Sequence, residues 1–84
     1  MNLLIDAGNT RLKWGLHDGR NWCARGAVST ETPDALAAAL ADLPPPQRLF
    51  GANVAGPAVA AAMARVGARW QLEPEWLVPA GEAV

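Results

Sequence analysis

The 84-residue sequence contains no tyrosine, one cysteine and one histidine. A single thiol, Cys23, cannot form an internal disulfide, which is typical of a protein from a reducing compartment, and we expect it to be a small half-buried apolar residue. His17 has no second histidine or cysteine at a metal-ligand spacing. We therefore expect His17 at the surface of a strand end and no metal site built from these residue types.

The chain also has little net charge and lacks long apolar runs. Seven Lys and Arg oppose eight Asp and Glu, and the cations form no stripe, which argues against a nucleic-acid partner. No run approaches the roughly 18 apolar residues of a membrane span. The opening Met1–Asp6 has neither the basic start nor the apolar stretch of a secretory signal. We expect a soluble cytoplasmic protein that binds no membrane.

The first third of the chain is predicted to be a meander of three strands, which cover residues 2–6, 10–17 and 22–28. The first run is nearly continuous in apolar residues, as in a strand buried on both faces. The second alternates and places Leu12, Trp14 and Leu16 on one face, which we expect to pack in the core. The Asp18-Gly19 pair is a strong hairpin signal between the second and third strands.

After residue 28 the period becomes helical. Thr32 as N-cap and Pro33 at the first helical position predict a helix start. Its core-facing stripe is expected at i, i+4 and i+7, namely Leu36, Leu40 and Leu43. The three prolines 44–46 end this helix.

A fourth strand over residues 47–54 is predicted to precede a second helix, which begins at Pro57 and is capped by Gly67. A short fifth strand is expected around Trp76-Leu77-Val78. The order β-β-β-α-β-α-(β) predicts an α/β fold with a mixed sheet, antiparallel first and parallel through the crossover helices.

The turn between the first two strands has two interpretations. Asp and Asn both favour tight turns, so the segment can be an ordinary hairpin. Alternatively, the backbone N–H groups of Gly8, Asn9 and Thr10 can converge on a phosphate, with Lys13 as a point charge. Asp6 would repel that phosphate unless Mg²⁺ lies between them, directly or through its waters.

A family resemblance is carried by the stretch Asp6-Ala7-Gly8-Asn9-Thr10-Arg11-Leu12-Lys13. It is similar, at every specified position of Asp-x-Gly-Asn-Thr-x-x-Lys, to the first phosphate motif of type III pantothenate kinases, the family of the Bvg accessory factors. A second segment, Gly51–Pro57, is similar to the strand-to-helix segment that follows the first crossover helix in that family.

The resemblance implies a ribonuclease-H-like half of an actin-like ATPase fold, with ATP bound in the cleft between two halves. It implies phosphorylation of pantothenate to 4′-phosphopantothenate in coenzyme A synthesis, with Mg²⁺, a monovalent cation (K⁺ or NH₄⁺) and a cytoplasmic homodimer. Asp6 would lie near the metal-bound phosphates, residues 8–10 would form the cradle, and Lys13 would reach into the cleft.

One departure from the family pattern bears on activity. The family's catalytic base is the aspartate of a Gly-x-Asp-Arg motif, and no Asp-Arg pair occurs in this sequence. We therefore expect residues 1–84 to be an N-terminal half-domain that ends before this motif and is inactive alone. Two alternatives stay open: another actin-like superfamily kinase, and a non-catalytic α/β accessory or regulatory module.

Overall fold

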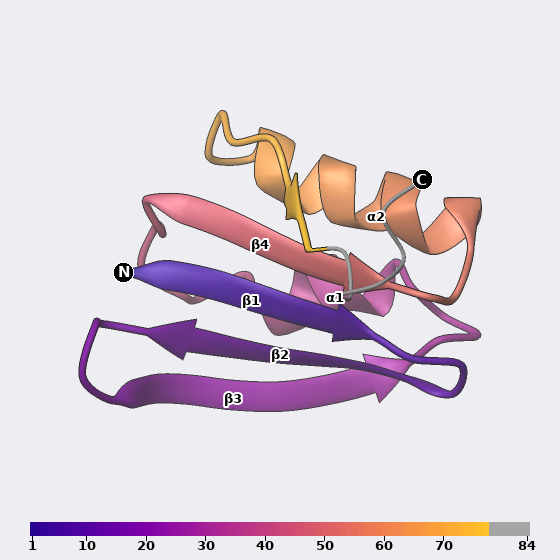
Figure 1. The fold of residues 1–84 in the computed structure, drawn as a ribbon, viewed down its shortest axis with the longest axis horizontal. Coiled ribbons are helices and arrows are strands. Elements are labelled where there is room, and N and C mark those ends of the chain that lie inside the picture. The colour runs from indigo at the N-terminus through magenta and orange to yellow at the C-terminus, as the bar shows by residue number, and fades with distance from the viewer. Residues whose placement is uncertain (78–84) are drawn as a thin grey trace.

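The computed structural model describes residues 1–77, which form one five-stranded sheet and two helices (Figure 1). The elements in chain order are β1 (Asn2–Ala7), β2 (Arg11–His17), β3 (Trp22–Ser29), α1 (Ala35–Ala39), β4 (Arg48–Asn53), α2 (Pro57–Ala68) and β5 (Glu75–Trp76). Neither helix of this part is long and apolar enough to cross a membrane.

The strands lie in the order β3-β2-β1-β4-β5. β1 pairs with β2, and β2 with β3, in antiparallel fashion, whereas β4 runs parallel to both β1 and β5. This confirms the predicted mixed α/β sheet, because two tight hairpins give antiparallel neighbours and the helical crossover gives a parallel one. The expected fifth strand forms at Glu75–Trp76, and its predicted last residue, Val78, lies outside the described residues.

The core lies between one face of the sheet and the two helices. Alternate residues of β1 and β2 are buried there, together with apolar residues of the helices and β4. The buried side chains of this core are Leu3, Ile5, Ala7, Leu12, Leu16, Leu36, Leu40, Leu49, Val59, Met63 and Val66. Trp14 packs against them, as predicted, and its ring covers Gly26 on β3. The opposite face of the sheet carries the odd-numbered residues of β2.

The first helix is shorter than predicted. It spans only Ala35–Ala39, its N-cap is Asp34 rather than Thr32, and no side chain caps it. The segment before it forms tight i→i+3 turns instead, such as the bond from the Ala35 N–H to the Thr32 carbonyl (3.0 Å). Leu43 lies beyond the helix, yet it still packs against the core.

Two single-residue expectations were also wrong. Gly67 does not cap α2 but lies inside it, where a Cβ would come within 2.5 Å of the Leu72 carbonyl oxygen. Close packing between the helix and the following loop therefore explains this glycine, and Gln71 takes the left-handed conformation (φ 58°) instead. Cys23 is exposed rather than half-buried, because its strand is at the edge of the sheet.

Candidate functional site

The turn between β1 and β2 is held by bonds from two directions. Across the turn, the Gly8 N–H donates to the Arg11 carbonyl at 2.9 Å. From the end of β3, the Thr30 N–H donates to the Thr10 carbonyl, and the Thr30 hydroxyl donates to the Gly8 carbonyl, both at 3.0 Å. Thr30 thus fixes the shape of the turn, a role that the sequence pattern around it did not indicate.

These bonds decide which turn amides are available to a ligand. The Gly8 N–H is engaged within the turn, so it is not one of the free donors that the sequence suggested. The N–H groups of Asn9 and Thr10 have no acceptor among residues 1–77, and both residues are exposed. Two backbone donors of a fixed turn therefore face solvent.

The second hairpin turn provides an internal comparison. There the Asp18 carboxylate accepts bonds from the N–H groups of Arg20 and Asn21, at 2.8 and 2.7 Å. The bonds from Asn21 and Arg20 lower the pKa of the Asp18 carboxyl, since they stabilise its charged form. This turn satisfies its own amides with its own carboxylate. The β1–β2 turn leaves comparable donors open.

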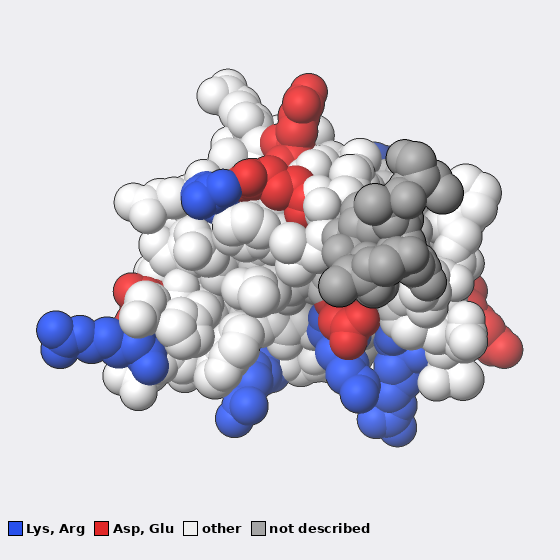
Figure 2. Space-filling model, in the orientation of Figure 1, with Lys and Arg blue, Asp and Glu red and all other residues white. Residues whose placement is uncertain are grey.

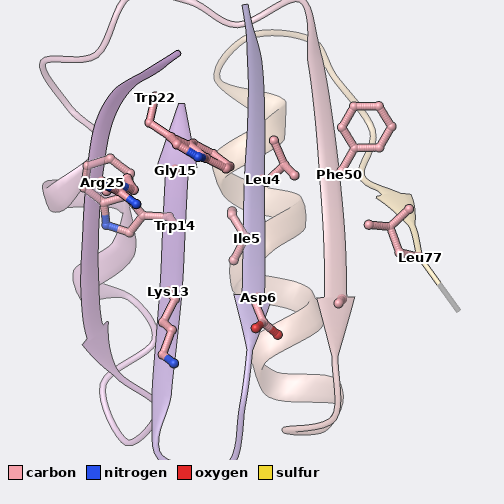
Figure 3. A pocket seen from close by; sticks show the side chains of 11 residues that line it. Leu4, Ile5, Asp6, Lys13, Trp14, Gly15, Trp22, Arg25, Phe50 and Leu77 are labelled. Carbon is pink, nitrogen blue, oxygen red and sulfur yellow. The ribbon is translucent and has the colours of Figure 1, made fainter. Parts of the chain in front are cut away.

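Side chains beside the first turn enclose a pocket of about 250 Å³, lined by Asp6, Gly8, Thr10, Arg11 and Lys13. Asp6 and Lys13 are direct cross-strand partners, so their side chains leave the same face of the sheet (Figure 3). Three residues of the stretch do not line this pocket: Asn9 is exposed in the turn, and Ala7 and Leu12 are buried in the core on the opposite face. Of Ala7 and Leu12, only the backbone could face a ligand.

The two cations of this pocket, Arg11 and Lys13, form no ion pair within the described residues. The ion pairs of residues 1–77 join Arg48 to Glu75 and Arg65 to Asp34, so Arg11 and Lys13 have no carboxylate within 4.0 Å. Figure 2 shows Lys and Arg side chains along the lower margin of this view, over β2 and β3. Two unpaired cations beside two free amides make a site suited to an anion.

The same pocket contains one carboxylate, Asp6. Whether Asp6 could bind a metal ion depends on the other ligand groups around it. Within residues 1–77 there is no group of three or more His, Cys, Asp or Glu side chains that could enclose an ion. Mg²⁺, however, is commonly held by one or two carboxylates together with substrate phosphates and waters. Asp6 therefore fits a metal that arrives with a phosphate ligand.

Gly8 has no role in the fold that requires a glycine. Its φ lies outside the left-handed region, and a Cβ there would meet only the Arg11 carbonyl oxygen at 3.5 Å, an ordinary contact. Gly67 and Gly15, in contrast, are sites where a Cβ would come within 2.5 Å of a neighbour. The absence of a side chain at residue 8 leaves room for a ligand to approach the turn.

The second segment that carries the family resemblance lies beside the first. Asn53, at the end of β4, is the parallel-strand partner of Ala7, and the Val54 N–H donates to the Ala7 carbonyl at 3.0 Å. The Asn53 side chain accepts from the Ala55 N–H at 2.8 Å and donates to the Gly56 carbonyl at 2.9 Å. It thereby shapes the turn into α2.

An apolar pocket of about 430 Å³ extends from the charged site along the open face of the sheet. Asp6 and Lys13 line one part of it, and Leu4, Phe50 and Trp22 line another (Figure 3). The Trp22 ring covers Gly15, where a side chain would displace it. Sequence analysis missed this surface, because Trp22 is the ladder partner of His17 and its ring reaches Gly15 diagonally across the two strands.

Comparison of the chain with known proteins identifies the family to which it belongs. A family model described as type III pantothenate kinase matches residues 2–84. The chain belongs to the type III pantothenate kinase family. This confirms the resemblance drawn from the Asp6–Lys13 stretch.

Curated relatives agree with the family model. The type III pantothenate kinase of Nitrosospira multiformis is 41% identical over 75 residues, which cover 89% of this chain and 29% of that protein. The one from Aromatoleum aromaticum is 43% identical over 82 residues, or 98% of this chain and 34% of that protein. The one from Dechloromonas aromatica is 48% identical over 56 residues, or 67% and 24%. The chain spans about a third or less of the length of these relatives.

Proposed function

We propose that this chain supplies the first phosphate-binding loop of an ATP-dependent kinase. The kinase transfers a phosphoryl group to the terminal hydroxyl of pantothenate and gives 4′-phosphopantothenate, the first committed step of coenzyme A synthesis. Family membership supports the reaction. The observation that carries the loop's role is the pocket at the β1–β2 turn, where unpaired cations and free amides lie beside a single carboxylate.

In this proposal the residues of the β1–β2 turn and the two side chains beside it have distinct tasks. The N–H groups of Asn9 and Thr10 donate to phosphate oxygens, and Gly8 lets the phosphate come close to the backbone. Lys13 contributes a point charge on the same face. Asp6 would hold Mg²⁺ through water, and the ion would offset phosphate charge that the carboxylate would otherwise repel.

The proposed fold setting is the ribonuclease-H-like half of an actin-like ATPase, residues 1–84, and the strand order β3-β2-β1-β4-β5 supports it. Transfer to a hydroxyl needs a general base within hydrogen-bond reach. The pocket's one carboxylate is assigned to the metal, so the base belongs to the part of the kinase that this chain does not match, and the chain alone is inactive. The family resemblance adds K⁺ or NH₄⁺, a homodimer and a cytoplasmic location to the proposal.

A chimaeric kinase tests this proposal. Residues 1–84 replace the corresponding segment of the Aromatoleum aromaticum relative, and formation of 4′-phosphopantothenate from Mg-ATP and pantothenate is measured. We expect activity from the chimaera and none from residues 1–84 alone. A folded chimaera without activity, or an active isolated chain, would contradict the proposal.

The variant Asp6→Asn in the same chimaera tests the metal's position. Loss of a carboxylate that acts through water is expected to reduce kcat/KM by about 10- to 100-fold and to raise the Mg²⁺ concentration needed for half-maximal rate. Asp18→Asn, in the opposite turn, is the matched control and should leave the Mg²⁺ requirement unchanged. An unaltered Mg²⁺ dependence in Asp6→Asn would refute the role assigned to Asp6.

A further inference from the structure

Beside the phosphate pocket lies a second polar pocket of about 430 Å³, lined by Thr10, Arg11, Ala27, Val28 and Ser29. Arg11 and Ser29 are cross-strand partners in the β2–β3 ladder, so their side chains leave the same face of the sheet. Thr10 and Arg11 also line the first pocket. The Arg11 side chain thus stands between two adjoining pockets, one toward β1 and one toward β3.

The hydrogen-bond donors of this second pocket are free. The Ser29 hydroxyl oxygen accepts a bond from the Glu31 N–H at 3.1 Å, which leaves its proton available to a ligand. The Thr10 hydroxyl and the Arg11 guanidinium have no partner among residues 1–77. No carboxylate is among the lining residues. The pocket therefore presents two hydroxyl protons and one guanidinium, and the carboxylate of Asp6 lies in the adjoining pocket.

We propose that Thr10 and Arg11, at the edge of the phosphate loop, form together with Ser29 of β3 a second oxyanion subsite, which binds a phosphate or carboxylate group on the β3 side of Arg11. A guanidinium presents a planar fork of N–H donors that matches either group, and hydroxyls on the same face complete the coordination. The two candidate ligands follow from the proposed function: they are the phosphate chain of ATP and the carboxylate of pantothenate. Its affinity for an oxyanion is independent of that function.

The test is a titration of the isotope-labelled chain with inorganic phosphate at constant ionic strength, followed through the amide signals of Ser29 and Asn9 by nuclear magnetic resonance. We expect phosphate to move the Ser29 signal. In Arg11→Gln the apparent affinity at Ser29 should fall by about tenfold or more, because a charge-assisted bond is lost. Ser29→Ala should weaken binding by a smaller factor, measured through the amide of Val28.

Arg20→Gln is the matched control, since it removes the same charge from the opposite turn, outside both pockets. It should change the affinity by less than about twofold, as expected for a distant, screened charge. If Arg20→Gln weakens binding as much as Arg11→Gln, or if phosphate leaves the Ser29 signal in place, the subsite does not exist. A well-dispersed spectrum of each variant shows that it is folded.

Further titrations distinguish the two sources. If pantothenate shifts the Ser29 signal and its alcohol analogue, which lacks the carboxylate, does not, the subsite binds the carboxylate of pantothenate. If only Mg-ATP shifts the signal, the subsite binds the nucleotide. If inorganic phosphate, Mg-ATP and pantothenate all leave Ser29 unmoved, the proposal is wrong. Failure of the proposed function has another signature: Mg-ATP then leaves Asn9 unmoved whatever happens at Ser29.

Discussion

Replacing Gly8 with alanine separates what the fold requires from what a bound phosphate requires. The added Cβ would lie 3.5 Å from the Arg11 carbonyl oxygen, an ordinary contact, and the backbone of Gly8 is outside the left-handed region. A glycine-to-alanine change at such a position restricts the unfolded chain and stabilises a protein by about 0.4–1 kcal/mol. We therefore expect the free energy of unfolding to stay the same or to rise by this amount.

The effect on ligand binding should be opposite. The methyl group would project from the turn that carries the two free amides, so a phosphate could no longer approach the Asn9 and Thr10 N–H groups at hydrogen-bond distance. Loss of one such bond to a charged group costs about 1.5–3 kcal/mol, which corresponds to a Kd for Mg-ATP that is higher by at least about tenfold. Calorimetric titration measures the affinity, and urea unfolding measures the stability.

Gly19→Ala is the matched control, in the other hairpin turn. Gly19 has φ 102°, which strains any side chain, so this variant should lose stability by about 1–2 kcal/mol and keep its Mg-ATP affinity. The reasoning fails if Gly8→Ala is destabilised like Gly19→Ala, because the fold would then require the glycine. It also fails if Gly8→Ala binds Mg-ATP as the parent chain does.

Two further predictions concern the scaffold. Gly67→Ala should destabilise the protein despite the higher helix propensity of alanine, because its Cβ would collide with the Leu72 carbonyl; a raised urea midpoint would refute this. Arg48, which donates to Glu75 at 2.8 Å, lowers the pKa of that carboxyl below its usual 4.5. This contribution to stability is complete above about pH 4.5 and is lost as pH falls through the lowered pKa, so amide exchange at Leu77, measured relative to its intrinsic rate, should accelerate in acid. Glu75→Gln should remove that pH dependence.

The strands were predictable because their signals are local. Alternation in β2 and the Asp18-Gly19 turn determine the meander, and a short helical crossover leaves the next strand parallel. The first helix was predicted too long, since Thr32 and Pro33 are good start signals but the chain forms i→i+3 turns before Ala35. Local residue preference cannot show how a short connection packs onto a sheet.

At the candidate site, the grouping of the charged side chains was predictable, whereas the hydrogen bonding of the turn amides was not. The alternation of β2 already puts Arg11 and Lys13 on one face, and the hairpin pairs Lys13 with Asp6. The bond from Gly8 to the Arg11 carbonyl and the support from Thr30 depend on distances that no sequence pattern reports. These contacts decide that two amides rather than three are free.

Packing contacts also distinguish two glycines, Gly67 and Gly8. Gly67 lies close to the end of α2, and glycine is the residue type preferred at helix C-caps, which is why it was predicted to be the cap. Its role is instead close packing against the Leu72 carbonyl in the following loop. Gly8 has no such neighbour. The phosphate proposed above would account for its lack of a side chain.

The most direct test of the central claim is a titration of the isotope-labelled chain with Mg-ATP, with Mg²⁺ alone and adenosine as controls. If the β1–β2 turn is a phosphate-binding hairpin, the largest amide shifts occur at Asn9 and Thr10 with Mg-ATP, and neither control reproduces them. The amides of Arg20 and Asn21, already bonded to Asp18, stay in place. Unmoved Asn9 and Thr10 signals at saturating Mg-ATP, or equal shifts in both turns, would contradict the claim.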